Sequence, residues 1–223
     1  MIDILDQEFF NIIGTTLYMA LISTTISSIL GIAFGLWLQN TSFYGKRFVV
    51  QVNRTLMATP PVVMGVVVYL LLMRNGPLGV FGILFTVEAM IIAQVLLITP
   101  IISGMVYTSA LRQANTIRAF GYTMGANKVQ VILLLLKELS NEIYFAIIAG
   151  FGRAMSEVGA IIIVGGNIRW HTRTMTTSIT MMRNQGDFSR AVYMGASLML
   201  IAFVLQAISN IFHKKDLVEN EDF

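Results

Sequence analysis

Five apolar stretches, each about as long as a bilayer is thick, constrain the fold of this chain more than any other feature. A transmembrane helix needs roughly 20 predominantly apolar residues. Five segments have that character: Ile12–Leu38, Leu56–Met73, Ala89–Leu111, Ile143–Ile168 and Ala191–Phe212. Of the 223 residues, 56% are hydrophobic and only 12% are charged, which is more apolar surface than a water-soluble domain of this size can bury. We therefore expect an all-α integral membrane protein of about five transmembrane helices, with residues 1–223 forming a single transmembrane domain.

A sixth apolar segment, Gly76–Val87, is shorter and rich in glycine, with Pro77 near its start. We interpret it as a turn and interfacial stretch that leads into the third span. A sixth crossing of the membrane is the alternative.

The positions of Lys and Arg predict how the chain is oriented, because cytoplasmic loops carry an excess of both. With the N-terminus outside, nine basic residues lie in the cytoplasm: Lys46, Arg47, Arg54, Arg112, Arg118, Lys128, Lys137, Lys214 and Lys215. The reverse orientation places five there: Arg74, Arg169, Arg173, Arg183 and Arg190. We expect a multi-pass protein of the inner or plasma membrane with its C-terminus in the cytoplasm. Because the cations are dispersed between the apolar runs, membrane lipids are expected partners and nucleic acid is not.

No pattern of a catalytic or metal site occurs in the sequence. There is no cysteine, and His171 has no second ligand at metal spacing. The one Gly-Lys pair, Gly45-Lys46, is followed by Arg47 and lacks the first glycine of a phosphate-binding P-loop. We expect no enzyme activity, no catalytic residue, no metal and no cofactor bound by this chain, and without a P-loop the chain cannot hydrolyse ATP by that mechanism itself.

The connection from residue 112 to 142 is long enough to have a function of its own on the cytoplasmic side. Residues on both sides of Gly125 favour helix, whereas Gly125 tolerates positive φ and offers a break between two short helices. A helix–Gly–helix lying on the membrane surface suits a docking element, and a solvated loop without a partner is the alternative. The placement of Thr123-Met124-Gly125-Ala126, after the third span and about 30 residues before a Gly-rich span, resembles the coupling loop of ABC importer permeases.

In that family the coupling loop lies in a groove of the ATPase subunit and transmits its closure to the membrane helices. The resemblance implies this role for Ala119, Phe120, Gly121, Thr123, Met124, Gly125 and Ala126. The sequence departs from the family pattern at two places. Ala119-Phe120-Gly121 stands where Glu-Ala-Ala is usual, and Lys137-Glu138 stands where Leu-Pro is common.

A second resemblance runs through the fourth span and the loop after it. Residues 152–160 read Gly-Arg-Ala-Met-Ser-Glu-Val-Gly-Ala, residues 164–168 read Val-Gly-Gly-Asn-Ile, and residues 172–177 read Thr-Arg-Thr-Met-Thr-Thr. This resembles the Arg-Ala-x-x-Glu-x-Gly-Ala … Gly-Asn-Ile … Thr-x-Thr pattern of molybdate, tungstate and sulfate permeases. With Thr59-Pro60-Pro61 at the start of the second span, the likeness covers most of the chain from about residue 55 onward. The double glycine, the Ser-Glu-Val form and the five-span length look closest to tungstate permeases.

The resemblance implies a type I ABC importer fold like that of molybdate permeases, with one amino-terminal span fewer. It also implies a homodimer around a central path, two ATPase subunits, and an extracytoplasmic solute-binding protein that delivers an oxyanion. Tungstate is the closest match, with molybdate and sulfate as alternatives. The implied residues of the path or its gate are Thr59, Pro60, Pro61, Gly65, Arg153, Glu157, Gly159, Asn167 and Thr174. A self-sufficient membrane carrier is the alternative class, although such carriers usually show internal repeats and more spans.

Arg153 and Glu157 would carry opposite charges at membrane depth, where an unpaired charge costs at least a few kcal/mol. At i and i+4 they share one helix face, so each can neutralise the other. The pair is either purely structural, or it faces the dimer axis and helps to switch the path between inward-open and outward-open arrangements. The neighbouring Gly150, Gly152 and Gly159 favour close helix packing.

Two further features remain open to more than one interpretation. Pro60-Pro61 and Pro100 remove backbone donors in or near spans, which either shapes packing or frees carbonyls toward a path. The outer loop before the last span carries Arg169, Trp170, His171, Arg173, Arg183 and Arg190. Its cations would attract a tetrahedral dianion, dock the solute-binding protein or contact lipid phosphates, and Trp170 would lie at the headgroup level.

Overall fold

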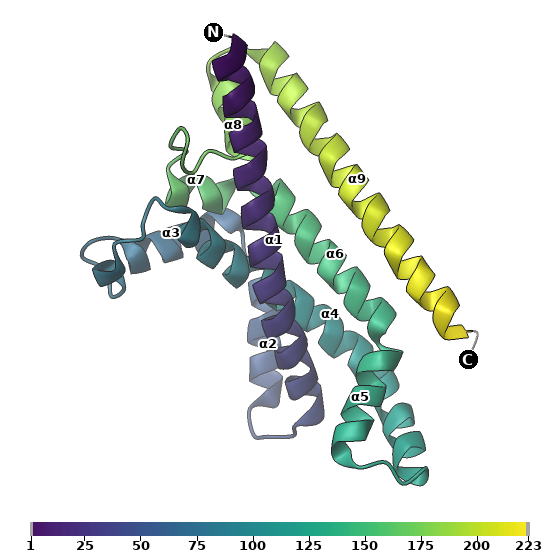
Figure 1. The fold of residues 1–223 in the computed structure, drawn as a ribbon. Coiled ribbons are helices and arrows are strands. Elements are labelled where there is room, and N and C mark those ends of the chain that lie inside the picture. The colour runs from purple at the N-terminus through teal and green to yellow at the C-terminus, as the bar shows by residue number, and fades with distance from the viewer. Residues whose placement is uncertain (1, 222–223) are drawn as a thin grey trace.

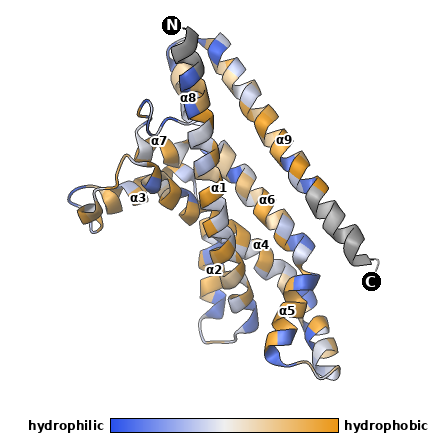
Figure 2. Cartoon of the chain, in the orientation of Figure 1, coloured by the Kyte–Doolittle hydropathy of each residue, from blue (hydrophilic) through white to orange (hydrophobic). Residues whose placement is uncertain are grey.

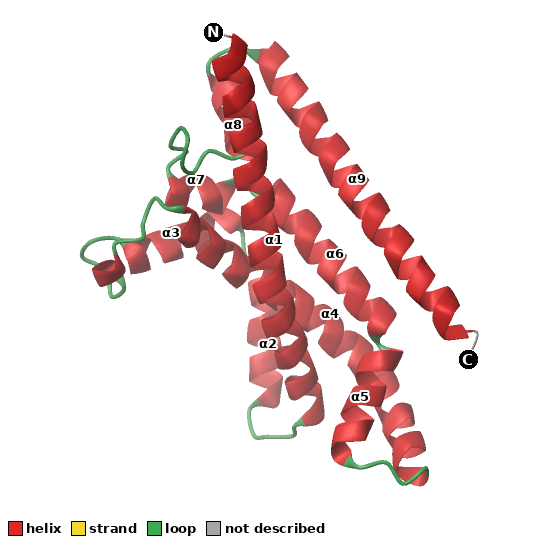
Figure 3. Cartoon of the chain, viewed as in Figure 1, coloured by secondary structure: helices red, strands yellow, loops and turns green. Residues whose placement is uncertain are grey.

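The computed structural model describes the backbone of residues 2–221 and the side chains of residues 7–211. Throughout that part of the chain the regular elements are helices (Figure 3). In order they are α1 (Ile2–Asn40), α2 (Lys46–Met57), α3 (Pro61–Leu72), the 3-10 turn η1 (Gly79–Phe81), α4 (Val87–Thr123), α5 (Lys128–Glu138), α6 (Ser140–Ser156), α7 (Gly159–Gly165), α8 (Met175–Asn184) and α9 (Phe188–Glu221). The side chains of Lys214 and Lys215, which entered the predicted orientation, lie outside the described part.

The crossings of the membrane are three long helices and two bent pairs. Long apolar helices cover Gln7–Asn40, Val87–Thr123 and Phe188–Ile211. The pair α2 and α3 is bent by 104° and the pair α6 and α7 by 57°, and each pair is apolar enough to count as one crossing. Five crossings result when each pair counts once, as predicted, and the protein is a multi-pass membrane protein.

Helix α4 lies at the centre of the bundle and packs against α1, α2, α3, α5, α6 and α7. In its most apolar stretch 61% of the residues are buried, against 11% in α9, which packs mainly against α8 and diverges from the other helices (Figure 1). Glycines allow α1 to approach α4 closely. A Cβ atom on Gly35 would lie 2.7 Å from the carbonyl oxygen of Ser103.

The polar ends of the bundle can be followed in Figure 2, where hydrophilic residues gather at the connection of α1 to α2 and at the tips of α4 and α5. Helix α1 begins at the opposite end, beside the connection of α8 to α9, and the two ends of the chain lie at opposite ends of the molecule (Figure 1). This arrangement agrees with an odd number of crossings.

The second span was predicted as the continuous segment Leu56–Met73, but this segment does not form one helix. Proline has no N–H and disfavours helix in the residue before it, so α2 ends at Met57 and Pro60 is extended. Pro61 then begins α3, a position that suits proline because the N–H there has no helical partner. The 12 residues of α3 extend only about 18 Å, less than the roughly 30 Å of the hydrocarbon layer.

The fourth span, predicted as Ile143–Ile168, is also broken, because α6 ends at Ser156 and α7 covers only Gly159–Gly165. Helix α9 begins at Phe188, three residues before Ala191, where the last span was predicted to begin. The outer loop contains a helix that the sequence analysis missed, α8, whose first turn is closed by a capping box between Thr174 and Thr177.

Two predictions about connections have different outcomes. Residues 73–86 contain only turns and η1, so the alternative of a sixth span at Gly76–Val87 is wrong. The predicted helix–Gly–helix is present around Gly125, but its first helix is the end of α4, which continues from the third span to Thr123. The residues before Gly125 thus do not form the separate helix on the membrane surface that was predicted. No proline or glycine between Gly104 and Gly121 interrupts α4, so the third span continues through them.

Candidate functional site

The breaks in the second and fourth crossings lie against each other. A Cβ atom on Gly65 would lie 2.7 Å from the Cα atom of Ala160, and one on Gly159 would lie 2.8 Å from Cγ2 of Val62. Such distances are shorter than packed side chains allow, so both glycines are needed for the backbones to approach. The fold thus brings together candidate residues of α3 and α7 that are far apart in the sequence.

The pair of Arg153 and Glu157 is present, although not on one continuous helix face as predicted. Glu157 follows the end of α6 in an extended conformation, and its Oε2 lies 3.6 Å from Nη2 of Arg153. The Glu157 side chain is 4% exposed and that of Arg153 is 38% exposed. Oε1 of Glu157 also accepts a hydrogen bond of 3.2 Å from the N–H of Ala160 in the first turn of α7. The carboxylate therefore both pairs with α6 and caps α7.

Side chains from two other helices satisfy backbone groups at the same break, and a side chain of a third helix bonds to one of them. Nε2 of Gln94 in α4 donates to the carbonyl of Ala154 at 2.9 Å, and Oγ1 of Thr176 in α8 donates to the carbonyl of Glu157 at 2.8 Å. Ser23 in α1 donates through Oγ to Oε1 of Gln94. Since helix ends leave carbonyls without partners, these contacts make the break a stable feature of the fold rather than a flexible kink.

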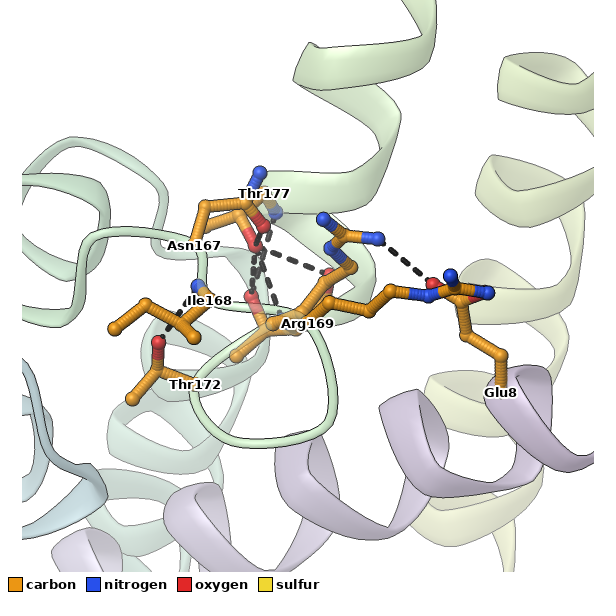
Figure 4. Close-up of polar contacts among 8 residues, drawn as sticks. Glu8, Asn167, Ile168, Arg169, Thr172 and Thr177 are labelled. Carbon is orange, nitrogen blue, oxygen red and sulfur yellow. Dashed lines mark hydrogen bonds and ion pairs between the residues drawn. The ribbon is translucent and has the colours of Figure 1, made fainter.

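Two further candidates, Asn167 and Thr174, are joined to the break through threonines. Oδ1 of Asn167 accepts from Oγ1 of Thr177 at 2.9 Å (Figure 4), and the Thr174 and Thr176 hydroxyls lie 3.1 Å apart. Asn167 has φ of 51°, a left-handed conformation that asparagine tolerates. Because Thr174, Thr176 and Thr177 are buried, the start of α8 is fixed over the break between α6 and α7.

The basic residues of the outer loop are largely paired with carboxylates. Arg169 and Arg173 each donate at 2.7 Å to a different oxygen of Glu8 in α1 (Figure 4), and Nε of Arg190 lies 3.2 Å from Asp187. The Arg169 guanidinium lies 5.5 Å from the ring centroid of Trp170. This pairing weakens the positive field that an unpaired rim would create.

The predicted coupling residues lie at the opposite end of the bundle from this loop, at the tip formed by α4 and α5. Ala119, Phe120, Gly121 and Thr123 belong to the last turns of α4, and Met124, Gly125 and Ala126 connect to α5. Gly125 has φ of 80°, and a capping box between Asn127 and Gln130 begins α5. Large apolar side chains at the tip are exposed: Phe120, Tyr122, Met124, Val129 and Leu133. An exposed apolar cluster of this kind is typical of a surface that contacts another protein or the membrane.

A small core within the tip and contacts to two other helices hold the tip on the bundle. Ala110 and Ala114 of α4 pack against Leu135 and Leu139, and this small core joins the ends of α4 and α5. Gln113 donates to Glu142 of α6 at 2.6 Å, while Arg118 donates to Oδ1 of Asn40 at the end of α1 at 2.7 Å. The tip is therefore joined to α6 and α1 by side-chain contacts as well as by the backbone.

Other candidates lie apart from both groups or were missed. Thr59 is part of the α2–α3 connection, where its hydroxyl donates to the carbonyl of Thr55 at 3.1 Å. The sequence analysis did not single out Ser23, Gln94 or Glu8. The signal for the first two was available, since polar side chains inside apolar spans are costly unless they are bonded.

Comparison with known proteins places the chain among anion permeases. No protein-family model matches it. A tungstate uptake system permease protein of Peptoclostridium acidaminophilum is 39% identical over 203 residues, which cover 91% of this chain and 89% of that protein. A probable anion ABC transporter permease protein of Haloferax volcanii is 35% identical, with coverages of 92% and 90%. A tungstate uptake system permease protein of Campylobacter jejuni is 32% identical, with coverages of 92% and 86%.

Proposed function

Because the chain belongs to the family of oxyanion ABC transporter permeases, we propose that it is the membrane-spanning subunit of a tungstate importer. The observation that carries the choice of tungstate is the 39% identity, over nearly the whole chain, with a tungstate permease. Molybdate and sulfate remain the alternative cargoes, because discrimination between such anions in these systems would lie in a separate binding protein.

The partners follow from the same proposal. The exposed apolar tip of α4 and α5 is suited to a groove of an ATPase subunit, and residues 112–142 form the coupling loop. One ATPase subunit would dock on each copy of a homodimer, and an extracytoplasmic binding protein would deliver the anion at the end that carries α8. This orientation places the tip, with Arg118 and Lys128, in the cytoplasm and the N-terminus outside.

The paired breaks are the proposed gate of the path. At the junction of α3 with α7, backbone segments without regular helix lie at membrane depth, where they are tolerated only inside protein or beside a water-filled path. Pro60, Pro61 and Gly65 would contribute one wall, and Gly159 with the Arg153–Glu157 pair the other.

Transport measurements test the proposal directly. The chain is co-expressed with candidate ATPase and binding-protein subunits from the same genome, and the complex is reconstituted into liposomes that contain ATP. We expect uptake of tungstate that requires the binding protein and ATP and that excess sulfate does not abolish. Uptake of molybdate or sulfate in preference to tungstate would overturn the choice of cargo. ATP-independent uptake by the chain alone would overturn the importer assignment.

A further inference from the structure

A cavity of about 470 Å³ lies at the end of the bundle where α1 and α9 begin. Its walls come from α1, α8, α9 and the loop after α7, and it lies apart from both the paired breaks and the coupling tip. The volume is that of a small-molecule site. None of the residues assigned above to the path, its gate or the coupling tip lines it.

Two donors without partners belong to this cavity. Nε of Arg173 and Oγ of Ser178 are buried and have no hydrogen-bond partner within the described part of the chain, and both residues line the cavity. Ser178 is fully buried. A guanidinium N–H can only donate, so its missing partner is an acceptor, and a buried donor without a partner destabilises the fold. The cavity therefore suits a ligand with at least two acceptor oxygens.

The charges around the cavity select among such ligands. Its lining contains three guanidiniums, from Arg169, Arg173 and Arg190, and two carboxylates, from Glu8 and Asp187, a net charge of +1. Both oxygens of Glu8 are already occupied by Arg169 and Arg173 (Figure 4). A singly charged anion would neutralise the site, whereas a dianion would leave excess negative charge in a partly buried space.

The rest of the cavity wall is apolar. Phe9 and Ile12 of α1 face the cavity together with Met181, Met182 and Met194. At its edge lies Tyr193, which is 74% exposed, and Phe10 nearby is 70% exposed. Exposed aromatic rings at the end of apolar helices are typical of the headgroup level of a membrane. A ligand that carries both an anionic group and hydrocarbon would match this lining.

From this lining we infer that the cavity binds the phosphodiester group of a membrane phospholipid. The phosphate oxygens accept from Nε of Arg173 and Oγ of Ser178, and the start of the acyl chains packs on the apolar wall. A free tetrahedral oxyanion offers the same acceptor oxygens, so the test must separate the two sources. The inference does not depend on the identity of the transported anion.

Native mass spectrometry of the purified full-length chain in dodecyl maltoside tests the site with phosphatidylglycerol as the probe. We expect one tightly retained lipid per chain and about tenfold weaker retention in Ser178→Ala, as the loss of one hydrogen bond to a charged group predicts. Arg190→Gln, which leaves the Glu8 contacts intact, should also weaken retention. Ser197→Ala is the matched control, because Ser197 is exposed on α9, bonds only to the carbonyl of Tyr193 and does not line the cavity.

Two competitors identify the source of the anionic group. A glycosyl diacylglycerol of the same chain length but without phosphate should not displace phosphatidylglycerol, and neither should sodium tungstate or sodium phosphate. Displacement by the phosphate-free lipid would show that only the apolar wall binds, and displacement by the free anions would assign the site to a soluble oxyanion. Either result, or wild-type retention in both Ser178→Ala and Arg190→Gln, would overturn the inference.

Discussion

Removing the charges of Arg153 and Glu157 one at a time should have unequal effects, because the two side chains are buried to different extents. Arg153→Met leaves the Glu157 carboxylate, only 4% exposed, without its cation. Glu157→Gln leaves a guanidinium that is 38% exposed and within reach of water. The glutamine also retains an oxygen for the N–H of Ala160, so the cap of α7 survives.

The expected magnitudes follow from these exposures. Stranding one partner of a buried pair costs about 3 kcal/mol at the lower end of the usual range, and we assign that value to Arg153→Met. For Glu157→Gln we expect about 1 kcal/mol, because the charge that remains is partly solvated and its pairing at 3.6 Å contributes little. The double variant should lose about 1 kcal/mol, which gives a coupling energy of about 3 kcal/mol in magnitude.

Two measurements separate a structural role from gating. Thermal unfolding in detergent should shift by roughly 6–12 °C for Arg153→Met and by 2–4 °C for Glu157→Gln and the double variant. Binding-protein-dependent uptake is measured on the same four proteins. Recovery of both stability and uptake in the double variant indicates a structural pair, while recovery of stability alone indicates a gate. Additive losses, or a larger loss for Glu157→Gln than for Arg153→Met, would refute the reasoning.

Three further predictions concern the tip, the break and the topology. Gly125→Val should abolish uptake without preventing membrane insertion, because a β-branched residue at φ of 80° is strained by about 1–2 kcal/mol. Gly125→Asn should retain uptake, and equal uptake by both variants would contradict the coupling role. Gln94→Leu should lower the thermal stability more than Ser23→Ala, since it leaves the Ala154 carbonyl without the Gln94 donor at about 1–3 kcal/mol, whereas the Ser23 hydroxyl also donates to the carbonyl of Ala20. A melting temperature unchanged from wild type would show that the break does not need this contact. A reporter fused after Phe223 should be cytoplasmic and one before Met1 external, and finding both on one side would contradict five crossings.

The sequence predicted the existence of the crossings but not their shape. Hydropathy measures how apolar a segment is and contains no information on its direction, so the apolar run after Leu56 looked like one span. Pro60-Pro61 gave a local signal for the 104° bend, which the prediction treated only as a possible kink. The break after Ser156 has no proline. It depends on a cap by Glu157 and on a hydrogen bond from Thr176, 19 residues later, and such a contact leaves no local pattern.

The candidate site was predictable to a similar extent. The resemblance to anion permeases pointed to Asn167, Thr174 and Glu157, and the structure connects all three through neighbouring threonines. The contacts of Gln94 with Ala154 and with Ser23 span 60 and 71 positions and depend on the packing of three helices. Gln94 and Ser23 can be recognised in the sequence as polar residues within apolar spans, but the sequence does not identify their partners.

Helix α4 physically connects the two regions that the transport proposal needs. At one end it contributes Thr123 to the coupling tip, and near the other Gln94 holds the carbonyl of Ala154 beside the break. About 44 Å of helix separate these positions at 1.5 Å per residue. Between them, Pro100 interrupts the hydrogen bonds of α4, and Asn53 of α2 donates to its carbonyl at 3.3 Å. Under the transport proposal, a force on the tip would reach the break along this one helix, and the helix would bend most easily at Pro100, where one of its backbone hydrogen bonds is missing.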